Sequence, residues 1–138
     1  MSFLLDTNVV SEIRKKAPNR GVVTWFASVP ADRLFLSVLV LGEIRQGIAR
    51  LARWDPAQAE SFEHWLSRLA DGYGDRIVPI TVQIAEVWGR LNVLDPVPVV
   101  DGLMAATALV HDWTLVTRNV HHVASTGTRL LNPFAAGE

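Results

Sequence analysis

The sequence contains no cysteine, and this absence limits the chemistry that the protein can perform. Disulfide bridges, thiol nucleophiles and zinc sites with cysteine ligands are excluded. Long apolar runs are also missing: the stretch 34–41 is short and contains Ser37, whereas a membrane-spanning helix needs about 20 apolar residues. Asp6 interrupts the apolar start, so we expect no signal peptide, no membrane association and a cytoplasmic location.

Lysine is scarce, because 11 of the 13 basic residues are arginine, and the formal net charge is -1. The composition as a whole therefore does not favour a nucleic-acid partner, although a local arginine cluster or a bound metal can still contact phosphate. The chain has 138 residues, of which 49% are hydrophobic. That is enough for one domain with a core and too little for two, so a single domain over residues 1–138 is expected.

Short apolar runs alternate with segments of helical periodicity along the whole chain. This alternation predicts an α/β fold with a mainly parallel central sheet and helices on both faces. Ser37, Asp55-Pro56 and Thr81 mark helix starts. The predicted strands are 3–5, 34–36, 77–80, 114–117 and 129–131. The predicted helices are 9–16, 21–28, a third that follows Ser37 and continues to the break at Asp55-Pro56, a fourth from that break to Gly72, a fifth that follows Thr81 and reaches Leu91, and 99–111.

Three acids occupy positions that a parallel sheet can bring together. Asp6 directly follows the first strand, Glu43 lies in the second turn of the helix after the second strand, and Asp101 begins the helix before the fourth strand. Sites in such sheets lie beyond the carboxyl ends of the strands. Taken singly, each acid has an ordinary explanation as a turn former or cap, a solvated helix residue or a partner of the helix dipole.

Converging carboxylates repel one another unless a cation neutralises them. Oxygen ligands without cysteine suit Mg²⁺ or Mn²⁺, and such an ion can activate water against a phosphodiester. Thr7 and Asn8 offer a hydroxyl and an amide to orient Asp6. Gly42 and Gly47 each cost a helix about 0.5–1 kcal/mol, so close packing or ligand approach beside Glu43 is expected there.

Four segments of the chain together form a specific pattern. They are Leu5-Asp6-Thr7-Asn8-Val9-Val10-Ser11-Glu12, Ser37-Val38 to Gly42-Glu43-Ile44, Asp101-Gly102-Leu103-Met104-Ala105-Ala106-Thr107-Ala108, and Leu115-Val116-Thr117-Arg118-Asn119 with Asn132-Pro133-Phe134. In this order and at these intervals they resemble the motifs of the PIN-domain family and of its VapC/FitB toxin branch. The resemblance runs from about Phe3 to Phe134.

The resemblance implies a single PIN domain over residues 1–138 that cleaves RNA with Mg²⁺ or Mn²⁺. It implies the toxin of a toxin–antitoxin pair, with a cognate VapB-type antitoxin that occludes the RNA groove, and a homodimer. Family motifs place Asp6, Glu43 and Asp101 as metal ligands and catalytic residues. The same motifs give Asn8, Thr117 and Asn119 a supporting role.

The fourth motif departs from the family at His122, which stands where an acid is usual. Two interpretations stay open: a neutral imidazole that holds water or metal in a supporting role, or a bystander. Arg118 is the first candidate for a phosphate contact, with a salt bridge to a nearby acid as the equal alternative. Arg50 belongs to a polar stripe with Gln46 and Arg53, which is either a solvated face or a guide for RNA.

Five tryptophans are many for this length, and they fill cores and interfaces more often than they stack on bases. Trp54 and Trp65, predicted on the third and fourth helices, are candidates for an antitoxin or dimer contact. The chief alternative function is a binding module on a catalytically decayed scaffold. A haloacid-dehalogenase-type phosphatase would need an acid at Asn8, and a phosphate receiver would need a late lysine, whereas both lysines are early.

Overall fold

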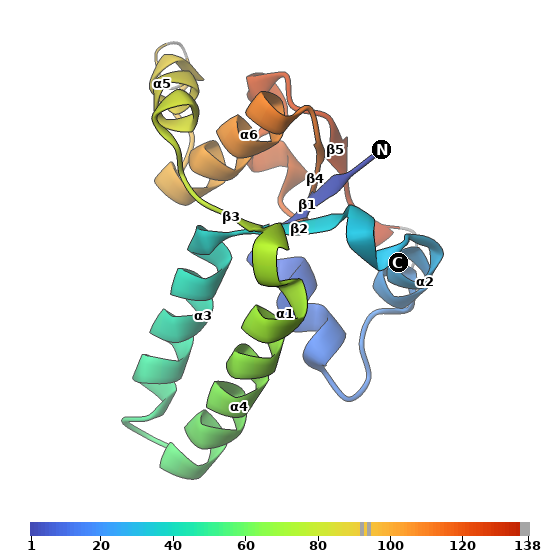
Figure 1. Ribbon diagram of the computed structural model, residues 1–138, viewed down its shortest axis with the longest axis vertical. Coiled ribbons are helices and arrows are strands. Elements are labelled where there is room, and N and C mark those ends of the chain that lie inside the picture. Colours follow the sequence, from blue (N-terminus) through green and yellow to red (C-terminus); the bar gives the residue numbers. More distant parts are fainter. Residues whose placement is uncertain (92, 94, 136–138) are drawn as a thin grey trace.

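The computed structural model describes residues 1–91, 93 and 95–135, and the strands among them form one parallel sheet. The order across the sheet is β3-β2-β1-β4-β5 (Figure 1). Each neighbouring pair runs parallel, which confirms the predicted sheet. The strands are β1 (Phe3–Leu5), β2 (Leu34–Ser37), β3 (Ile77–Val78), β4 (Thr114–Val116) and β5 (Leu130–Leu131).

Helices cover both faces of this sheet, as the alternating pattern predicted. Figure 1 shows α1, α3 and α4 on one side and α5 and α6 on the other. None of the described helices is long and apolar enough to cross a bilayer. The helices are α1 (Thr7–Arg14), α2 (Arg20–Ser28), α3 (Val38–Leu51), α4 (Pro56–Tyr73), α5 (Val82–Leu91) and α6 (Val99–His111), with short 3₁₀ turns η1 (Ala31–Arg33), η2 (Gly74–Arg76), η3 (Val120–His122) and η4 (Ala124–Thr126).

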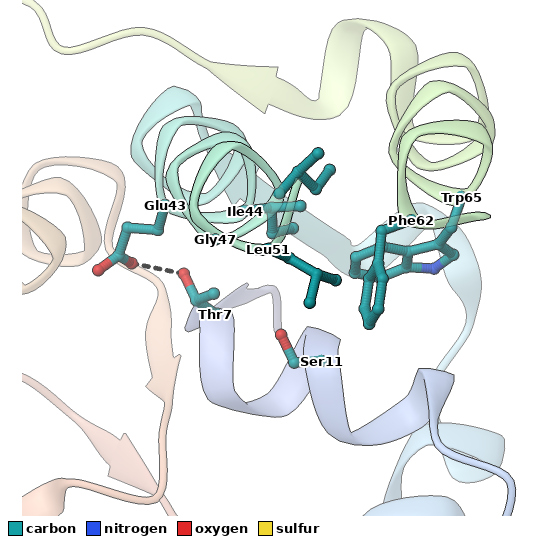
Figure 2. A pocket seen from close by; sticks show the side chains of 9 residues that line it. Thr7, Ser11, Glu43, Ile44, Gly47, Leu51, Phe62 and Trp65 are labelled. Atoms are coloured by element: carbon teal, nitrogen blue, oxygen red, sulfur yellow. Dashed lines mark hydrogen bonds between the residues drawn. The ribbon is translucent and has the colours of Figure 1, made fainter. Parts of the chain in front are cut away.

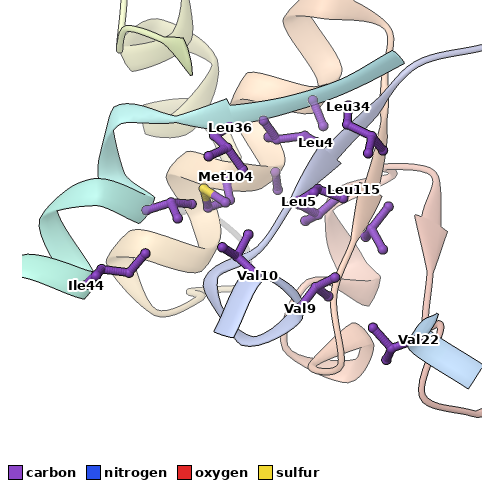
Figure 3. Close-up of a cluster of buried hydrophobic side chains, with 14 of the residues drawn as sticks. Leu4, Leu5, Val9, Val10, Val22, Leu34, Leu36, Ile44, Met104 and Leu115 are labelled. Carbon is purple, nitrogen blue, oxygen red and sulfur yellow. The ribbon is translucent and has the colours of Figure 1, made fainter. Parts of the chain in front are cut away.

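The centre of the core is β1, which pairs with β2 on one side and β4 on the other. Leu4 and Leu5 are fully buried although successive strand residues point to opposite faces. Both faces of the strand are therefore covered, as a central parallel strand requires. Figure 3 shows these leucines beside Leu36, Met104 and Leu115, so one cluster joins the sheet to α6.

Helix starts follow the expected capping chemistry, with one difference. The Ser37 hydroxyl accepts a hydrogen bond from the backbone N–H of Leu39 at 3.1 Å, and Asp55 and Thr81 cap α4 and α5 in the same way. The first helix begins at Thr7, two residues before the predicted start. This happens because Asp6 itself caps α1, accepting from the backbone N–H of Thr7 at 2.7 Å.

Glycine packing differs from the expectation for α3. A Cβ added at Gly42 or Gly47 would meet nothing within 4 Å, so close packing does not explain either residue. Gly102 is the tight position instead, since a Cβ there would lie 2.8 Å from Cγ2 of Val97 and 3.0 Å from Cδ1 of Trp88. The glycine thereby lets α5 and α6 pack closely beside Asp101.

The helices α3 and α4 form an antiparallel hairpin that extends away from the sheet (Figure 1). An ion pair of 2.6 Å between Arg45 and Glu63 joins the two helices. Trp65 lies on α4 as predicted, but the placement of Trp54 on the third helix is wrong. Trp54 falls in the turn between the helices, because α3 ends at Leu51, and 84% of its surface is exposed.

Candidate active site at the carboxyl edge of the sheet

The direction of the chain through the sheet reverses between β1 and β4. From β1 the chain moves outward through β2 to β3 and then returns to β4 on the other side of β1. Ligands of open parallel sheets bind at such a reversal, beyond the carboxyl ends of the strands. Asp6 directly follows β1 and Thr117 directly follows β4. The candidate site is therefore centred between these two residues.

Asp6 is held from both of its carboxylate oxygens. Oδ1 accepts from the backbone N–H of Thr7 at 2.7 Å, and Oδ2 accepts from the Thr117 hydroxyl at 2.7 Å. The amide of Asn8 donates to Oδ2 at 3.4 Å. Burial raises the pKa of Asp6, the two shorter hydrogen bonds oppose this, and the charges of Asp101 and Glu43 raise the pKa further. Three carboxylates from three separate elements thus interact electrostatically.

The side chain of Thr7 orients Glu43, whereas the sequence predicted that this side chain would orient Asp6. The Thr7 hydroxyl donates to Oε1 of Glu43 at 2.6 Å, as Figure 2 shows. The expectation that this hydroxyl orients Asp6 is wrong, since only the backbone N–H of Thr7 does so. One residue at the start of α1 therefore connects two of the expected ligands.

Asp101 lies in the first turn of α6 and meets His122 of η3. Nδ1 of His122 lies 3.1 Å from Oδ2 of Asp101. The side chain of Asp101 is 21% exposed and that of His122 is 40% exposed, so both border solvent. The departure from the family motif thus lies in direct contact with an expected ligand.

The loop after β4 brings the expected supporting residues together. Oγ1 of Thr117 accepts from the backbone N–H of Asn119 at 3.0 Å, and Oδ1 of Asn8 accepts from the backbone N–H of Arg118 at 3.3 Å. The Arg118 guanidinium lies over the Phe134 ring, 4.6 Å from its centroid. Its charge also helps to lower the pKa of Glu12. Arg118 therefore has structural partners, and both interpretations of this residue stay predictions.

Arg50 lies outside this cluster, exposed in the last turn of α3 and about two turns beyond Glu43. The other two members of the polar stripe, Gln46 and Arg53, are exposed as well. The stripe is therefore a solvent-facing surface that begins near the acidic edge. This position is compatible with Arg50 as part of a solvated face and with Arg50 as a guide for RNA.

The donor chemistry at this edge fits a hard divalent ion. Asp6, Glu43 and Asp101 offer carboxylate oxygens. Burial and, to a smaller extent, the charges of the other two carboxylates raise the pKa of Asp6, and a bound cation would relieve the repulsion. The side chains are neighbours and not a closed ligand set: among the described residues, no three His, Asp or Glu side chains form a ready-made metal group.

An apolar groove beside Glu43 was missed by the sequence-based reasoning. It encloses about 350 Å³ between α1, α3 and α4 (Figure 2). The guanidinium of Arg14 lies 3.5 Å from the centroid of the Phe62 ring and links α1 to α4 at the groove. In the sequence, the groove could have been inferred from Phe62 and Trp65, two large aromatic residues three positions apart on one predicted helix. The lining residues are Thr7, Ser11, Glu43, Ile44, Gly47, Ile48, Leu51, Phe62 and Trp65.

Comparisons with known proteins agree with this geometry. The family model described as PIN domain matches residues 3–124. The protein named Toxin FitB, from Neisseria gonorrhoeae, is 30% identical, with 96% of this chain and 98% of the relative covered. The VapC ribonuclease Y4jK of Sinorhizobium fredii is 27% identical, with 96% and 97% covered. The crystal structure of FitAcB from Neisseria gonorrhoeae superposes with a TM-score of 0.88 at 28% identity, covering 96% and 98%.

The geometry defines a class of α/β protein: a doubly wound parallel sheet with acidic residues at the point where the strand order reverses. The match over residues 3–124 makes the assignment specific: the chain belongs to the PIN-domain family. Its similarity to the toxin FitB and to a VapC ribonuclease extends over nearly the whole chain.

Proposed function

We propose that this protein is the toxin of a VapBC-type toxin–antitoxin pair, an endoribonuclease that hydrolyses RNA phosphodiester bonds with a divalent metal ion. The observation that carries the proposal is the convergence of Asp6, Glu43 and Asp101 at the reversal point of the sheet, where the charges of Glu43 and Asp101 act on the buried carboxylate of Asp6. PIN-domain ribonucleases generally use divalent ions, and relatives of this chain are named as toxin and as ribonuclease.

In this proposal Asp6, Glu43 and Asp101 hold Mg²⁺ or Mn²⁺ and are the catalytic residues. The bound ion supplies a water of lowered pKa and neutralises charge on the phosphodiester. Thr117 fixes the buried carboxylate of Asp6 by its 2.7 Å hydrogen bond. Asn8 contacts the same carboxylate at 3.4 Å and also ties down the loop after β4. The roles of Asn119 and His122 in that loop are to support this arrangement.

RNA contact at this edge must be local, because the formal net charge of the chain is -1. Arg118 leaves β4 beside Asp6 and is exposed, so a phosphate can reach it at the margin of the site. Arg50 extends the contact along α3, on the exposed stripe that begins near Glu43. A guanidinium can bind phosphate with two parallel hydrogen bonds, which favours arginine for this task.

The proposed partners are a VapB-type antitoxin and a second copy of this chain, in the cytoplasm. The apolar groove beside Glu43 supports an antitoxin contact, because a segment seated on Phe62 and Trp65 would also cover the acidic edge. Trp54 is 84% exposed at the far end of the α3–α4 hairpin and suits a protein contact. Co-expression with the product of the neighbouring reading frame tests this partner: a stable complex that no longer cleaves RNA is expected.

The decisive experiment measures cleavage of a mixed RNA pool by the purified, partner-free chain. Reactions contain Mn²⁺, Mg²⁺ or EDTA and compare the wild type with Asp6→Asn, Glu43→Gln and Asp101→Asn. Asp32→Asn is the matched control, because Asp32 is exposed and precedes β2, at the opposite edge of the sheet. Metal-dependent cleavage by the wild type and the control, lost in the other variants, is expected.

No cleavage by a folded wild-type chain with either metal would contradict the proposal. The chain would then be a binding module on a PIN scaffold, acting on RNA or protein without catalysis. Binding of the same RNA pool, measured by fluorescence anisotropy in the same buffers, would identify that alternative function directly.

A further inference from the structure

The contact between His122 and Asp101 defines which ring nitrogen carries the proton. Nδ1 lies 3.1 Å from Oδ2 of Asp101. A carboxylate oxygen has no hydrogen to donate, so Nδ1 must be the donor. In the neutral ring Nε2 then keeps its lone pair. His122 therefore occupies one oxygen of an expected metal ligand and limits how far that carboxylate can rotate.

Hydrogen bonds along one loop connect this contact to the opposite side of the site. Thr117, at the end of β4, donates to Asp6 at 2.7 Å and accepts from the backbone N–H of Asn119 at 3.0 Å. The backbone carbonyl of Asn119 in turn accepts from the backbone N–H of His122 at 3.0 Å. The loop 117–122 thus reaches Asp6 with its first residue and Asp101 with its last.

Packing holds the His122 ring in this position. The His121 ring meets it edge-on, with 4.2 Å between the ring centroids and 70° between the ring planes. Val123, the next residue, is only 2% exposed and anchors the end of the 3₁₀ turn in the core. The ring can therefore hold the carboxylate with little loss of entropy on binding a ligand.

We infer that His122 is a positioning residue, which orients the Asp101 carboxylate toward the site through its Nδ1–H and so replaces an acid with a hydrogen-bond donor. This inference rests on the proposed function. A hydrogen-bond donor behind a metal ligand orients that ligand without adding negative charge to a site where carboxylates already repel one another. Its loss should weaken metal binding and leave the chemical step intact once metal is bound.

Three variants separate this role from a direct role of Nε2. In His122→Asn the side-chain amide can donate from about the position of Nδ1, whereas in His122→Gln it reaches about the position of Nε2, and His122→Ala removes both. Isothermal titration of Mn²⁺ into the metal-stripped full chain gives the affinity, and RNA cleavage is followed across a Mn²⁺ titration. Nitrogen NMR of the metal-free wild type reports the tautomer of His122 without any activity measurement.

We expect the Nδ1–H tautomer in the metal-free chain, and Mn²⁺ affinity lowered about 10-fold or more in His122→Ala, the usual effect of losing an outer-shell partner. His122→Asn should bind like the wild type, and saturating Mn²⁺ should restore cleavage by His122→Ala. The inference is overturned by wild-type affinity in His122→Ala, by rescue with Gln and not Asn, or by slow cleavage that saturating Mn²⁺ does not restore.

The outcomes also distinguish failure of this inference from failure of the proposed function. A wild type that binds Mn²⁺ and cleaves RNA, with all three variants unchanged, overturns only the role of His122. A wild type that neither binds Mn²⁺ nor cleaves RNA overturns both, and the NMR tautomer then shows only whether the hydrogen bond exists.

Discussion

Thr117 and Asp6 come from the ends of two neighbouring strands, and the Thr117 hydroxyl donates a buried 2.7 Å hydrogen bond to Oδ2 of Asp6. The same oxygen of Thr117 accepts from the backbone N–H of Asn119. One hydroxyl thus pairs the most buried expected metal ligand with the loop that carries His122. Few other side chains could do both, because the task needs a donor and an acceptor on one small group.

Substituting Thr117→Val should therefore lower both stability and activity. The isosteric change leaves Oδ2 of Asp6 with only the 3.4 Å contact from Asn8 and removes the side-chain acceptor of the Asn119 N–H. A buried polar group that is left unsatisfied costs about 1–3 kcal/mol. Urea unfolding measures the stability, and RNA cleavage at fixed Mn²⁺ is expected to fall about 10-fold or more. Thr117→Ser keeps the hydroxyl and serves as the control; equal losses in both variants would contradict the explanation.

Asp6→Asn should make the metal-free chain more stable at neutral pH while abolishing cleavage. Burial and two neighbouring carboxylates raise the pKa of Asp6, so its ionised form destabilises the fold as pH rises through that pKa. Asparagine removes the charge and still caps α1. Thermal unfolding in EDTA is expected to shift upward by a few degrees. A melting temperature of Asp6→Asn below that of the wild type would contradict this prediction.

Glu12 should contribute stability that disappears in acid. Hydrogen bonds from Lys15 at 2.9 Å and from the backbone N–H of Asn19 at 2.9 Å hold the pKa of Glu12 below its usual 4.5. Because the folded-state pKa is lowered, the contribution is present above the unfolded value and is lost as pH falls through the folded one.

Unfolding by urea across this pH range, compared with Glu12→Gln, provides the measurement. The wild type should have the larger free energy of unfolding at neutral pH, and the difference from Glu12→Gln should disappear in acid. Glu86→Gln, on an exposed position of α5, is the control and should show no such pH dependence. If the difference in free energy of unfolding between wild type and Glu12→Gln stayed constant with pH, the charge of Glu12 could not be its cause.

Gly102→Ala should destabilise the fold next to the acidic edge. The new Cβ would lie 2.8 Å from Val97, which precedes α6, and 3.0 Å from Trp88 of α5. Overpacking of this kind costs about 1–3 kcal/mol. Gly89→Ala is the matched change, since a Cβ there meets nothing within 4 Å and a helix interior gains about 0.5–1 kcal/mol from alanine. In calorimetry, the melting temperature should fall in Gly102→Ala and rise in Gly89→Ala.

Much of the fold could be predicted because the elements are short and sharply punctuated. Apolar runs ending in polar turns identified the strands, and Ser37, Asp55 and Thr81 identified helix starts that the structure confirms. The start of α1 was placed two residues late because Asp6-Thr7-Asn8 was interpreted as a polar turn, whereas Asp6 caps the helix and Thr7 is its first residue.

The sequence could predict that three acids lie at one edge of the sheet, but it could not predict which side chains bond to them, and the roles of these acids stay predictions. Asp6, Glu43 and Asp101 follow from their positions relative to the strands, and the structure brings them to one edge. The bond from Thr7 to Glu43 joins residues 36 positions apart, so its partner depends on how α3 packs on α1. The apolar groove likewise depends on the position of α4, which no local pattern determines.

Asp6 belongs to the central strand as much as to the site, since its backbone N–H donates to the Val116 carbonyl at 2.9 Å and extends the pairing of β1 with β4. Amides in such a position exchange with solvent only when the whole molecule opens. In hydrogen exchange, Asp6 should therefore be protected to the same degree as Leu5. Heating should inactivate the enzyme in a single step with global unfolding, and local fraying of the α3–α4 hairpin tip should leave the buried part of the active site in place.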